Sequence, residues 1–281
     1  MRWPRFDEAR LTRAGSRAPT VAAMTHLPDA ASLRAALADT GWGPISVLAT
    51  TGSTNADLAA SARQGAPAGT VLVATHQSAG RGRLTRSWEA PPGTSVATSV
   101  LVAPRVPLST WGWLPLLVGV AVARGITDAT GLDARLKWPN DVLIGDSKVC
   151  GILCEAVPEP PGPKAVLGFG LNTALRAEQL PVPTATSLLL EGSQVDATTV
   201  LTAVLTELEE VLRAWEGGAD PRPGYRALCA TLGAEVSVLL PVGDTVQGRA
   251  VDVDADGGLI VDTARGRRTF VAGDIQHLRP R

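Results

Sequence analysis

Two short segments concentrate anion-binding groups in a chain that carries a formal net charge of only −1. The first is the glycine- and arginine-rich run Gly80–Trp88, and the second is Lys137–Asp141, which is followed by Lys148. Glycine lets a backbone approach a ligand closely, and guanidinium groups match phosphate and carboxylate. The cations are almost all arginine, so the three lysines, Lys137, Lys148 and Lys164, indicate sites that need a compact ammonium group. We predict a site where a small anion and a nucleotide phosphate lie side by side.

Each segment also has a simpler interpretation. Gly80–Trp88 alone is compatible with a solvated charged loop, and Lys137–Asp141 with a polar turn at the end of a strand. Trp88 favours an ordered loop, because an indole ring gains from burial. Asn140 can bond the edge of a base, while Asp141 can bind a cation or orient an amine. The two segments together favour a binding site over two unrelated surface features.

Several common site types are absent from the sequence. It contains no GxxxxGK[ST] phosphate loop, and Gly80-x-Gly82-x-x-Thr85 lacks the third glycine of the dinucleotide fingerprint. It has no HExxH, GxSxG or CxxC motif and only three histidines, so we predict no protein metal centre. The three cysteines, Cys150, Cys154 and Cys229, form no disulfide framework and indicate reduced thiols in the cytoplasm.

Alternating helix and strand signals surround these segments. Apolar spacing and capping residues predict helices over 30–40, 56–64, 109–130 and 198–215. Runs rich in β-branched residues predict strands over 45–50, 71–75, 95–102, 135–138, 142–144, 149–157 and 165–169. The apolar run Trp111–Ala123 is too short to span a bilayer and is predicted to be a buried helix. Leu175–Leu190 has no clear period and is predicted to be a mobile loop.

The composition, with 45% apolar and 19% charged residues, is that of a globular protein. With a net charge of −1, the chain has no excess of positive charge for binding nucleic acid or a membrane surface. Residues 1–25 lack the apolar core of a secretory signal, are expected to be disordered, and contain Met24 as an alternative start. Residues 26–232 form the expected catalytic domain. Short alternating strands after residue 233 predict a small all-β barrel over 233–281.

Five motifs resemble those of biotin–protein ligases in the biotin/lipoate ligase superfamily. They occur in the order and spacing of that family, and they are Ser53-Thr54-Asn55, Gln77–Arg83, Lys137–Asp141, Lys148–Glu155 and Gly168–Asn172. The resemblance implies an α+β fold: a mixed β-sheet with packed helices, similar to class II aminoacyl-tRNA synthetases, plus an SH3-like C-terminal barrel. It also implies that ATP, with Mg²⁺, activates biotin to biotinyl-5′-AMP. The biotinyl group would then pass to a lysine of a biotin carboxyl carrier domain.

The resemblance also assigns residues. Those implied to hold the biotin ureido ring are Ser53, Thr54, Gln77 and the backbone of Gly80 and Arg81. Those implied to shape the wall around the valeryl arm are Trp88, Gly168 and Gly170. Those implied around the biotin carboxylate and the ATP phosphates are Arg83, Arg86, Lys148 and Lys137. Those implied on the adenine or ribose side are Asn140 and Asn172. Asp141 would orient the incoming lysine, and the remaining members of the implied binding set are Asn55, Gly82 and Gly151.

One position departs from the family pattern: Thr85 stands where glycine is usual, so a positive φ there would be strained. Two other functions stay open. A lipoate or octanoate ligase would share the fold, but lipoate lacks the ureido group that Gln77 and its neighbours would bind. A biotin-sensing repressor would need a DNA-binding domain, and the residues before the first expected strand lack a helix-turn-helix pattern. We therefore expect a ligase without a specific nucleic-acid partner, as a monomer or weak homodimer.

Overall fold

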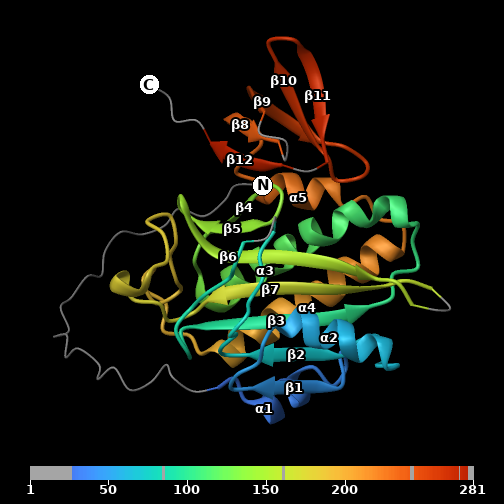
Figure 1. Ribbon diagram of the computed structural model, residues 1–281, viewed down its shortest axis with the longest axis vertical. Coiled ribbons are helices and arrows are strands. Elements are labelled where there is room, and N and C mark those ends of the chain that lie inside the picture. The colour runs from blue at the N-terminus through green and yellow to red at the C-terminus, as the bar shows by residue number, and fades with distance from the viewer. Residues whose placement is uncertain (1–26, 84–85, 160–161, 241–243, 272, 278–281) are drawn as a thin grey trace, which may run out of the picture.

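The computed structural model describes residues 27–83, 86–159, 162–240, 244–271 and 273–277. A seven-stranded mixed sheet forms the centre of the main body, in the order β1-β2-β3-β7-β6-β5-β4 (Figure 1). β1 and β2 are parallel, and every other neighbouring pair is antiparallel. Its strands are β1 (Ile45–Leu48), β2 (Val71–Ala74), β3 (Ser95–Val102), β4 (Ala134–Lys137), β5 (Asp141–Ile144), β6 (Ser147–Val157) and β7 (Lys164–Asn172).

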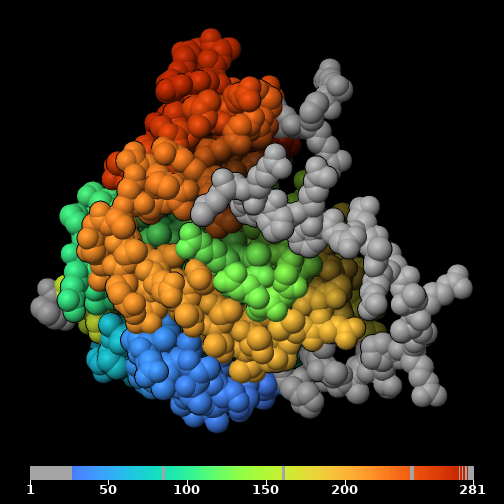
Figure 2. All heavy atoms as spheres, turned by 180° about the vertical axis from the view of Figure 1, so that it is seen from behind, coloured from blue at the N-terminus to red at the C-terminus, as the bar shows by residue number. Residues whose placement is uncertain are grey.

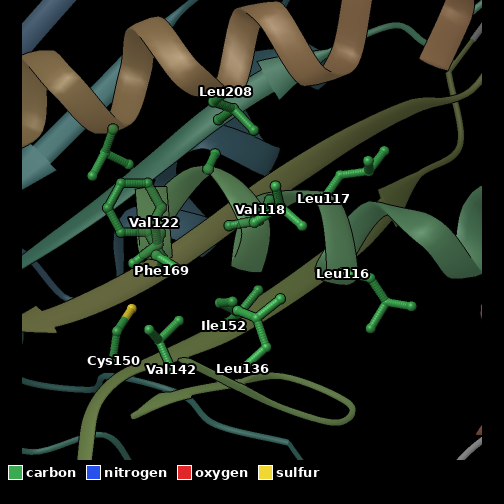
Figure 3. Close-up of a cluster of buried hydrophobic side chains, with 14 of the residues drawn as sticks. Leu116, Leu117, Val118, Val122, Leu136, Val142, Cys150, Ile152, Phe169 and Leu208 are labelled. Atoms are coloured by element: carbon green, nitrogen blue, oxygen red, sulfur yellow. The ribbon is translucent and has the colours of Figure 1, made fainter. Parts of the chain in front are cut away.

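Two long helices cover one face of this sheet. They are α3 (Leu114–Thr130), which follows the 3₁₀ turn η1 (Leu108–Trp113), and α4 (Ala197–Glu216). Figure 3 shows Val118 and Val122 of α3 and Leu208 of α4 among the side chains packed with Phe169 and Ile152 of the sheet. The segment Leu108–Thr130 is long and apolar enough to cross a membrane by length and composition, but most of it is buried in this core. The predicted buried helix is therefore confirmed.

The opposite face of the sheet carries the short helix α2 (Thr54–Arg63). Leu58 and Ala62 of α2 form a second apolar cluster with Leu101 of β3 and Val166 of β7. Because both faces of β3 and β7 are covered, nearly all of their residues are buried. The face beside α2 also carries the glycines of β6 and β7, so a cavity can form there.

The C-terminal region forms a separate five-stranded antiparallel sheet in the order β11-β10-β9-β8-β12. Figure 2, which views the molecule from behind, shows this region in red as a lobe at the end opposite the blue N-terminal elements. Its strands are β8 (Glu235–Leu239), β9 (Thr245–Val253), β10 (Leu259–Thr263), β11 (Gly266–Phe270) and β12 (Asp274–His277). The predicted α+β fold with an appended all-β domain is confirmed.

Two indole groups join this lobe to the main body. Trp113 Nε1 donates to the carbonyl of Ala255 at 2.7 Å, and Trp138 Nε1 donates to the carbonyl of Gly257 at 3.0 Å. Both tryptophan side chains are almost fully buried. The two sheets are therefore fixed to each other through the turn between β9 and β10.

The structure differs from the sequence prediction in several elements. Helix α1 (Ala30–Ala36) stops short of residue 40, because Thr40 bonds back to Leu37 in a turn. The helix expected from residue 109 begins as η1, and the helix α5 (Arg222–Leu228) was not predicted. β7 extends to Asn172 rather than ending at residue 169. Residues 1–25, expected to be disordered, lie outside the described residues.

Residues 175–190 were expected to be a mobile loop; the structure buries Leu175 and residues 185–188 and leaves 176–178 and 181–184 exposed. Ala185 forms a parallel bridge with Lys148, and the backbone of Leu188 bonds the carbonyl of Asn172 at 3.0 Å. Leu175 and Ser187 are fully buried, and the Ser187 hydroxyl bonds the Leu175 carbonyl. The apparent lack of a period reflects an irregular segment that completes its hydrogen bonds with other elements.

Candidate active site

In the segment Gly80–Trp88, here called the arginine loop, the described residues 80–83 and 86–88 run antiparallel to each other. Arg81 and Ser87 form an antiparallel bridge, the Gly82 N–H donates to the Arg86 carbonyl at 2.7 Å, and the Trp88 N–H donates to the Gly80 carbonyl at 2.9 Å. A Cβ at position 80 would collide with the Trp88 carbonyl, so this crossing requires glycine. The strain expected at Thr85 lies outside the described residues.

The start of α2 lies beneath the arginine loop. Ser53 caps the helix by accepting a hydrogen bond from the Ala56 N–H. The N–H and hydroxyl of Thr54 lie 2.8 Å and 3.1 Å from Gln77 Oε1. The carboxamide oxygen of Gln77 therefore accepts from the first residue of α2. Its Nε2 lies beside Gly80, where it can still donate a hydrogen bond.

Glycines on β6 and β7 let one aromatic ring lie directly on the sheet. Gly151 and Gly170 are opposite each other in the β6–β7 ladder. A Cβ on Gly170 would lie 2.6 Å from the Trp88 ring, and one on Gly151 would lie 2.8 Å from it. The buried Trp88 Nε1 has no hydrogen-bond partner. The ring therefore packs on these two glycines in a space that any larger residue would close.

A cluster of cationic groups lies next to this slot. Lys148 Nζ is 2.6 Å from Asp141 Oδ1 and 5.6 Å from the centre of the Trp88 ring. Arg83 Nη1 donates to Asn140 Oδ1 at 3.1 Å and to the carbonyl of Gly273, next to β12, at 3.4 Å. The cluster thus joins the arginine loop, the turn between β4 and β5, strand β6 and the C-terminal sheet.

A cavity of about 320 Å³ connects these parts. The predicted residues that line it are Ser53, Thr54, Asn55, Gln77, Arg81, Gly82, Arg83, Arg86, Trp88, Lys137, Asn140, Asp141, Lys148, Gly151, Gly168 and Gly170. Segments that are distant in the sequence therefore converge on one cavity with cations at one end and neutral polar groups at the other.

The comparisons with known proteins agree with this geometry. Residues 47–172 match the Biotin/lipoate A/B protein ligase family, and residues 231–278 match the Biotin protein ligase C terminal domain. The chain is 43% identical to the biotin–[acetyl-CoA-carboxylase] ligase of Mycobacterium tuberculosis over 263 residues, covering 89% of this chain and 96% of that protein. It belongs to the biotin protein ligase family.

Further relatives support this membership. The chain is 32% identical to the bifunctional ligase/repressor BirA of Bacillus subtilis, over 82% of this chain and 72% of that protein. The biotin protein ligase of Aquifex aeolicus, solved in complex with biotin and ATP, superposes with a TM-score of 0.71. That match has 27% identity and covers 85% of this chain and 100% of the other. The similarity therefore includes both sheets of this ligase-family chain.

Two predicted site residues do not line the cavity. Gly80 is buried in the stem of the arginine loop, where only its backbone acts. Asn172 is buried at the end of β7, and its Nδ2 donates to the carbonyl of Thr186 at 2.9 Å. Asn172 thus holds the packed segment that carries Ala185. Its predicted contact with adenine or ribose stays a prediction.

Two side chains in the cavity wall are already engaged with the protein. Arg81 makes two hydrogen bonds with Glu155, at 2.9 Å and 2.7 Å, so its guanidinium faces β6. Asn55 Nδ2 donates to the Glu155 carboxylate and to the Leu153 carbonyl, and Asn55 Oδ1 accepts from the Ser99 hydroxyl. Both side chains therefore brace the wall of this ligase-family site rather than offering their polar atoms to the cavity.

Sequence reasoning missed the contribution of the C-terminal sheet. Leu239 of β8 and Ile275 of β12 line the cavity beside Lys137 and Pro139. Both are ordinary apolar residues in alternating strands, and nothing in their local pattern distinguishes them from core positions. Only the packing of the second sheet against the main body brings them to the cavity of this ligase-family protein.

Proposed function

We propose that this chain activates biotin with ATP and transfers the biotinyl group to a lysine of a biotin carboxyl carrier domain. The observation that carries the proposal is the cavity, in which the arginine loop, the glycines of β6 and β7, and the Lys148–Asp141 pair converge. Its volume of about 320 Å³ suits a small ligand. Membership of the biotin protein ligase family supports the same activity.

The neutral end of the cavity suits the ureido ring of biotin. A ureido group has N–H donors and a carbonyl acceptor, and each needs a partner once it leaves water. Ser53 and Thr54 supply hydroxyl groups, and Gln77 supplies a carboxamide whose Nε2 is still a donor. The Trp88 ring, which packs on Gly151 and Gly170, offers an apolar wall that suits the arm following the ureido ring. We therefore assign these residues to biotin.

The cationic end suits the two anions that must meet. In the first half-reaction a carboxylate oxygen of biotin forms a bond with the α-phosphorus of ATP, and pyrophosphate leaves. Lys148, Arg83, Arg86 and Lys137 all line this end of the cavity. Their positive charges offset the repulsion between carboxylate and phosphate and stabilise the charge that develops in the transition state. Asn140, which accepts from Arg83, is assigned to the nucleotide side.

The described residues fit an ATP-borne magnesium ion better than a protein-held one. They include no cluster of three or more histidine, cysteine, aspartate or glutamate side chains that could hold a metal. Mg²⁺ commonly binds through substrate phosphates with few protein ligands. We therefore assign Mg²⁺ to the phosphates of ATP, where it neutralises the leaving pyrophosphate, and give no residue a ligating role.

Asp141 suits the second half-reaction. The nitrogen of the acceptor lysine must be neutral when it forms a bond with the acyl carbon and AMP leaves. Asp141 lines the cavity and already holds an ammonium group, that of Lys148, at 2.6 Å. A carboxylate in this position can orient a second amine and accept its proton.

The acceptor, compartment and assembly are further parts of the proposal. The carrier domain of a biotin-dependent carboxylase is the proposed acceptor, as the name of the Mycobacterium tuberculosis relative, biotin–[acetyl-CoA-carboxylase] ligase, supports. The three cysteines are free, which supports a reducing compartment, the cytoplasm. We propose a monomer or weak homodimer with no specific nucleic-acid or membrane partner.

Intact-mass spectrometry of a biotin carboxyl carrier domain tests the proposal. The carrier is incubated with the chain, Mg-ATP and either biotin or lipoate, and a carrier with its acceptor lysine changed to arginine is the control. We expect a biotin-sized mass gain that needs ATP and the lysine. A gain with lipoate alone would reject the assignment of the neutral end to a ureido ring. Accumulation of biotinyl-AMP without any gain would reject the proposed acceptor.

A further inference from the structure

Glu155 on β6 accepts three side-chain hydrogen bonds beside the site, although it does not line the cavity. Its two carboxylate oxygens accept from the two terminal nitrogens of Arg81 at 2.9 Å and 2.7 Å. Such a paired contact fixes the plane of the guanidinium as well as its position. Arg81 is in the stem of the arginine loop, where it bridges Ser87. Glu155 therefore fixes the stem of that loop to the sheet.

The same carboxylate also holds the start of α2. Glu155 Oε2 accepts a second bond, from Asn55 Nδ2, at 2.8 Å. Asn55 is only 5% exposed, and Gly168 lies so close to its amide that a Cβ there would collide with it. The Asn55 amide therefore cannot turn away from Glu155 without breaking buried hydrogen bonds.

From Asn55 the contacts continue to the groups assigned to biotin. The hydroxyl of Ser99 lies 2.6 Å from Asn55 Oδ1 and 2.8 Å from Thr54 Oγ1. Because Asn55 Oδ1 can only accept, the Ser99 proton points to Asn55, and Ser99 can then accept from Thr54. With its hydroxyl proton on Ser99, Thr54 reaches Gln77 through its backbone N–H, which donates to Gln77 Oε1 at 2.8 Å. One unbroken path thus runs from the arginine loop through Glu155 to Gln77.

The energy of this contact points to a role in geometry rather than stability. The Arg81 and Glu155 side chains are 44% and 31% exposed. An ion pair with that exposure stabilises a fold by no more than about 1 kcal/mol. Loss of the pair would leave the protein folded but would free the stem of the loop that carries Arg83 and Trp88.

We propose that Glu155 is a positioning residue for the ligation reaction. It holds the stem of the arginine loop, through Arg81, and the start of α2, through Asn55, at a fixed separation, so that the groups assigned to biotin on these two elements keep their relative positions. The proposal rests on the proposed function. Glu155 acts through Arg81 and Asn55, because its carboxylate is turned to these two side chains.

The substitution Glu155→Gln tests this role. Glutamine keeps one oxygen for Asn55 but sets an NH₂ group against the donors of Arg81. We expect the KM for biotin and the release rate of biotinyl-AMP each to rise about 10-fold, as for loss of one charge-assisted hydrogen bond. The KM for ATP and the unfolding temperature should stay close to those of the unchanged chain. A purely structural role would instead lower the unfolding temperature and change both KM values.

A double-mutant cycle and a matched control complete the experiment. If Glu155 acts through Arg81, the double variant Arg81→Gln/Glu155→Gln should be no worse than Arg81→Gln alone. The control is Asp262→Asn, which breaks an equivalent two-bond pair with Arg267 in the C-terminal sheet and should leave both readouts unchanged. Additive effects in the cycle, or unchanged biotin KM and adenylate release in Glu155→Gln, would overturn the proposal. Failure of the unchanged chain to biotinylate the carrier would reject the proposed function instead.

Discussion

At the scale of single residues, the contact between Lys148 and Asp141 predicts a specific loss of chemistry. Lys148→Gln removes a charge that the carboxylate and phosphate need in the transition state, while the groups assigned to the ureido ring stay in place. We expect the single-turnover rate of adenylate formation to fall roughly 100-fold, with much less change in biotin binding by calorimetry. The control is Lys164→Gln, because Lys164 instead donates to the carbonyl of Ala66 at the far end of β7. An equal loss of binding and rate would show that Lys148 has only a structural role.

The sequence identified most of the residues around the cavity, because their chemistry is unusual in this chain. Lysines among arginines and glycines beside a tryptophan can be recognised without a structure. The engagement of Arg81 with Glu155 could not be predicted, because the two residues are 74 positions apart and each is of a common type. The contacts of Leu239 and Ile275 could not be predicted either, because their strands belong to the other sheet.

At the scale of elements, the helices and strands followed their patterns wherever one face is buried. β3 and β7 were recognisable as apolar runs, and α4 as a helix with regular leucine spacing. The packing of residues 184–189 could not be predicted, because their backbone bonds include distant partners such as Lys148 and Asn172. An irregular segment with distant partners leaves no periodic signal in the sequence.

The β6–β7 ladder predicts that its glycines set the position of the arginine loop. Gly170→Ala adds a Cβ that would lie 2.6 Å from the Trp88 ring and must push the ring out of its slot. Such overpacking costs about 1–3 kcal/mol, so we expect the KM for biotin to rise roughly 10-fold. Gly52→Ala is the control, since a Cβ there meets no atom within 4 Å. An unchanged KM for biotin in Gly170→Ala would contradict the assignment of the Trp88 ring to the wall of the biotin site.

At the scale of the whole molecule, the C-terminal sheet completes the cavity and does not act as a separate module. It contributes Leu239 and Ile275 to the cavity wall and the Gly273 carbonyl to Arg83. Its connection to the main body includes the pair Arg226–Asp252, joined by bonds of 2.6 Å and 2.7 Å. Any change that loosens this interface should therefore open the site as well as destabilise the lobe.

His277 makes this interface sensitive to pH. Its Nε2 lies 3.0 Å from the Thr231 hydroxyl, which also accepts from the Trp138 N–H. Burial lowers the pKa of His277, and Lys137 lowers it further, while Asp146 opposes the shift. The pKa in the folded protein is thus below the unfolded value of about 6.5. At pH values between the folded and the unfolded pKa of His277, the unfolded chain therefore binds more protons than the folded chain. The stability that neutral His277 contributes is complete above about pH 6.5 and is lost as the pH falls through the folded pKa.

Thermal unfolding at two pH values tests this sensitivity. Lowering the pH from about 7.5 to about 5.5 should reduce the unfolding temperature of the unchanged chain more than that of His277→Gln, which carries no imidazole to protonate. An NMR titration of the His277 ring should show a midpoint below about 6.5. Thr231→Val is the matched variant, because it removes the hydroxyl and should destabilise the interface at both pH values. Equal losses in the unchanged chain and in His277→Gln would show that the pH response of the fold arises elsewhere. A larger loss of stability in the unchanged chain than in His277→Gln would mean that protonation of His277 weakens the contact that holds Leu239 and Ile275 at the cavity. The affinity for biotin should then fall over the same pH range.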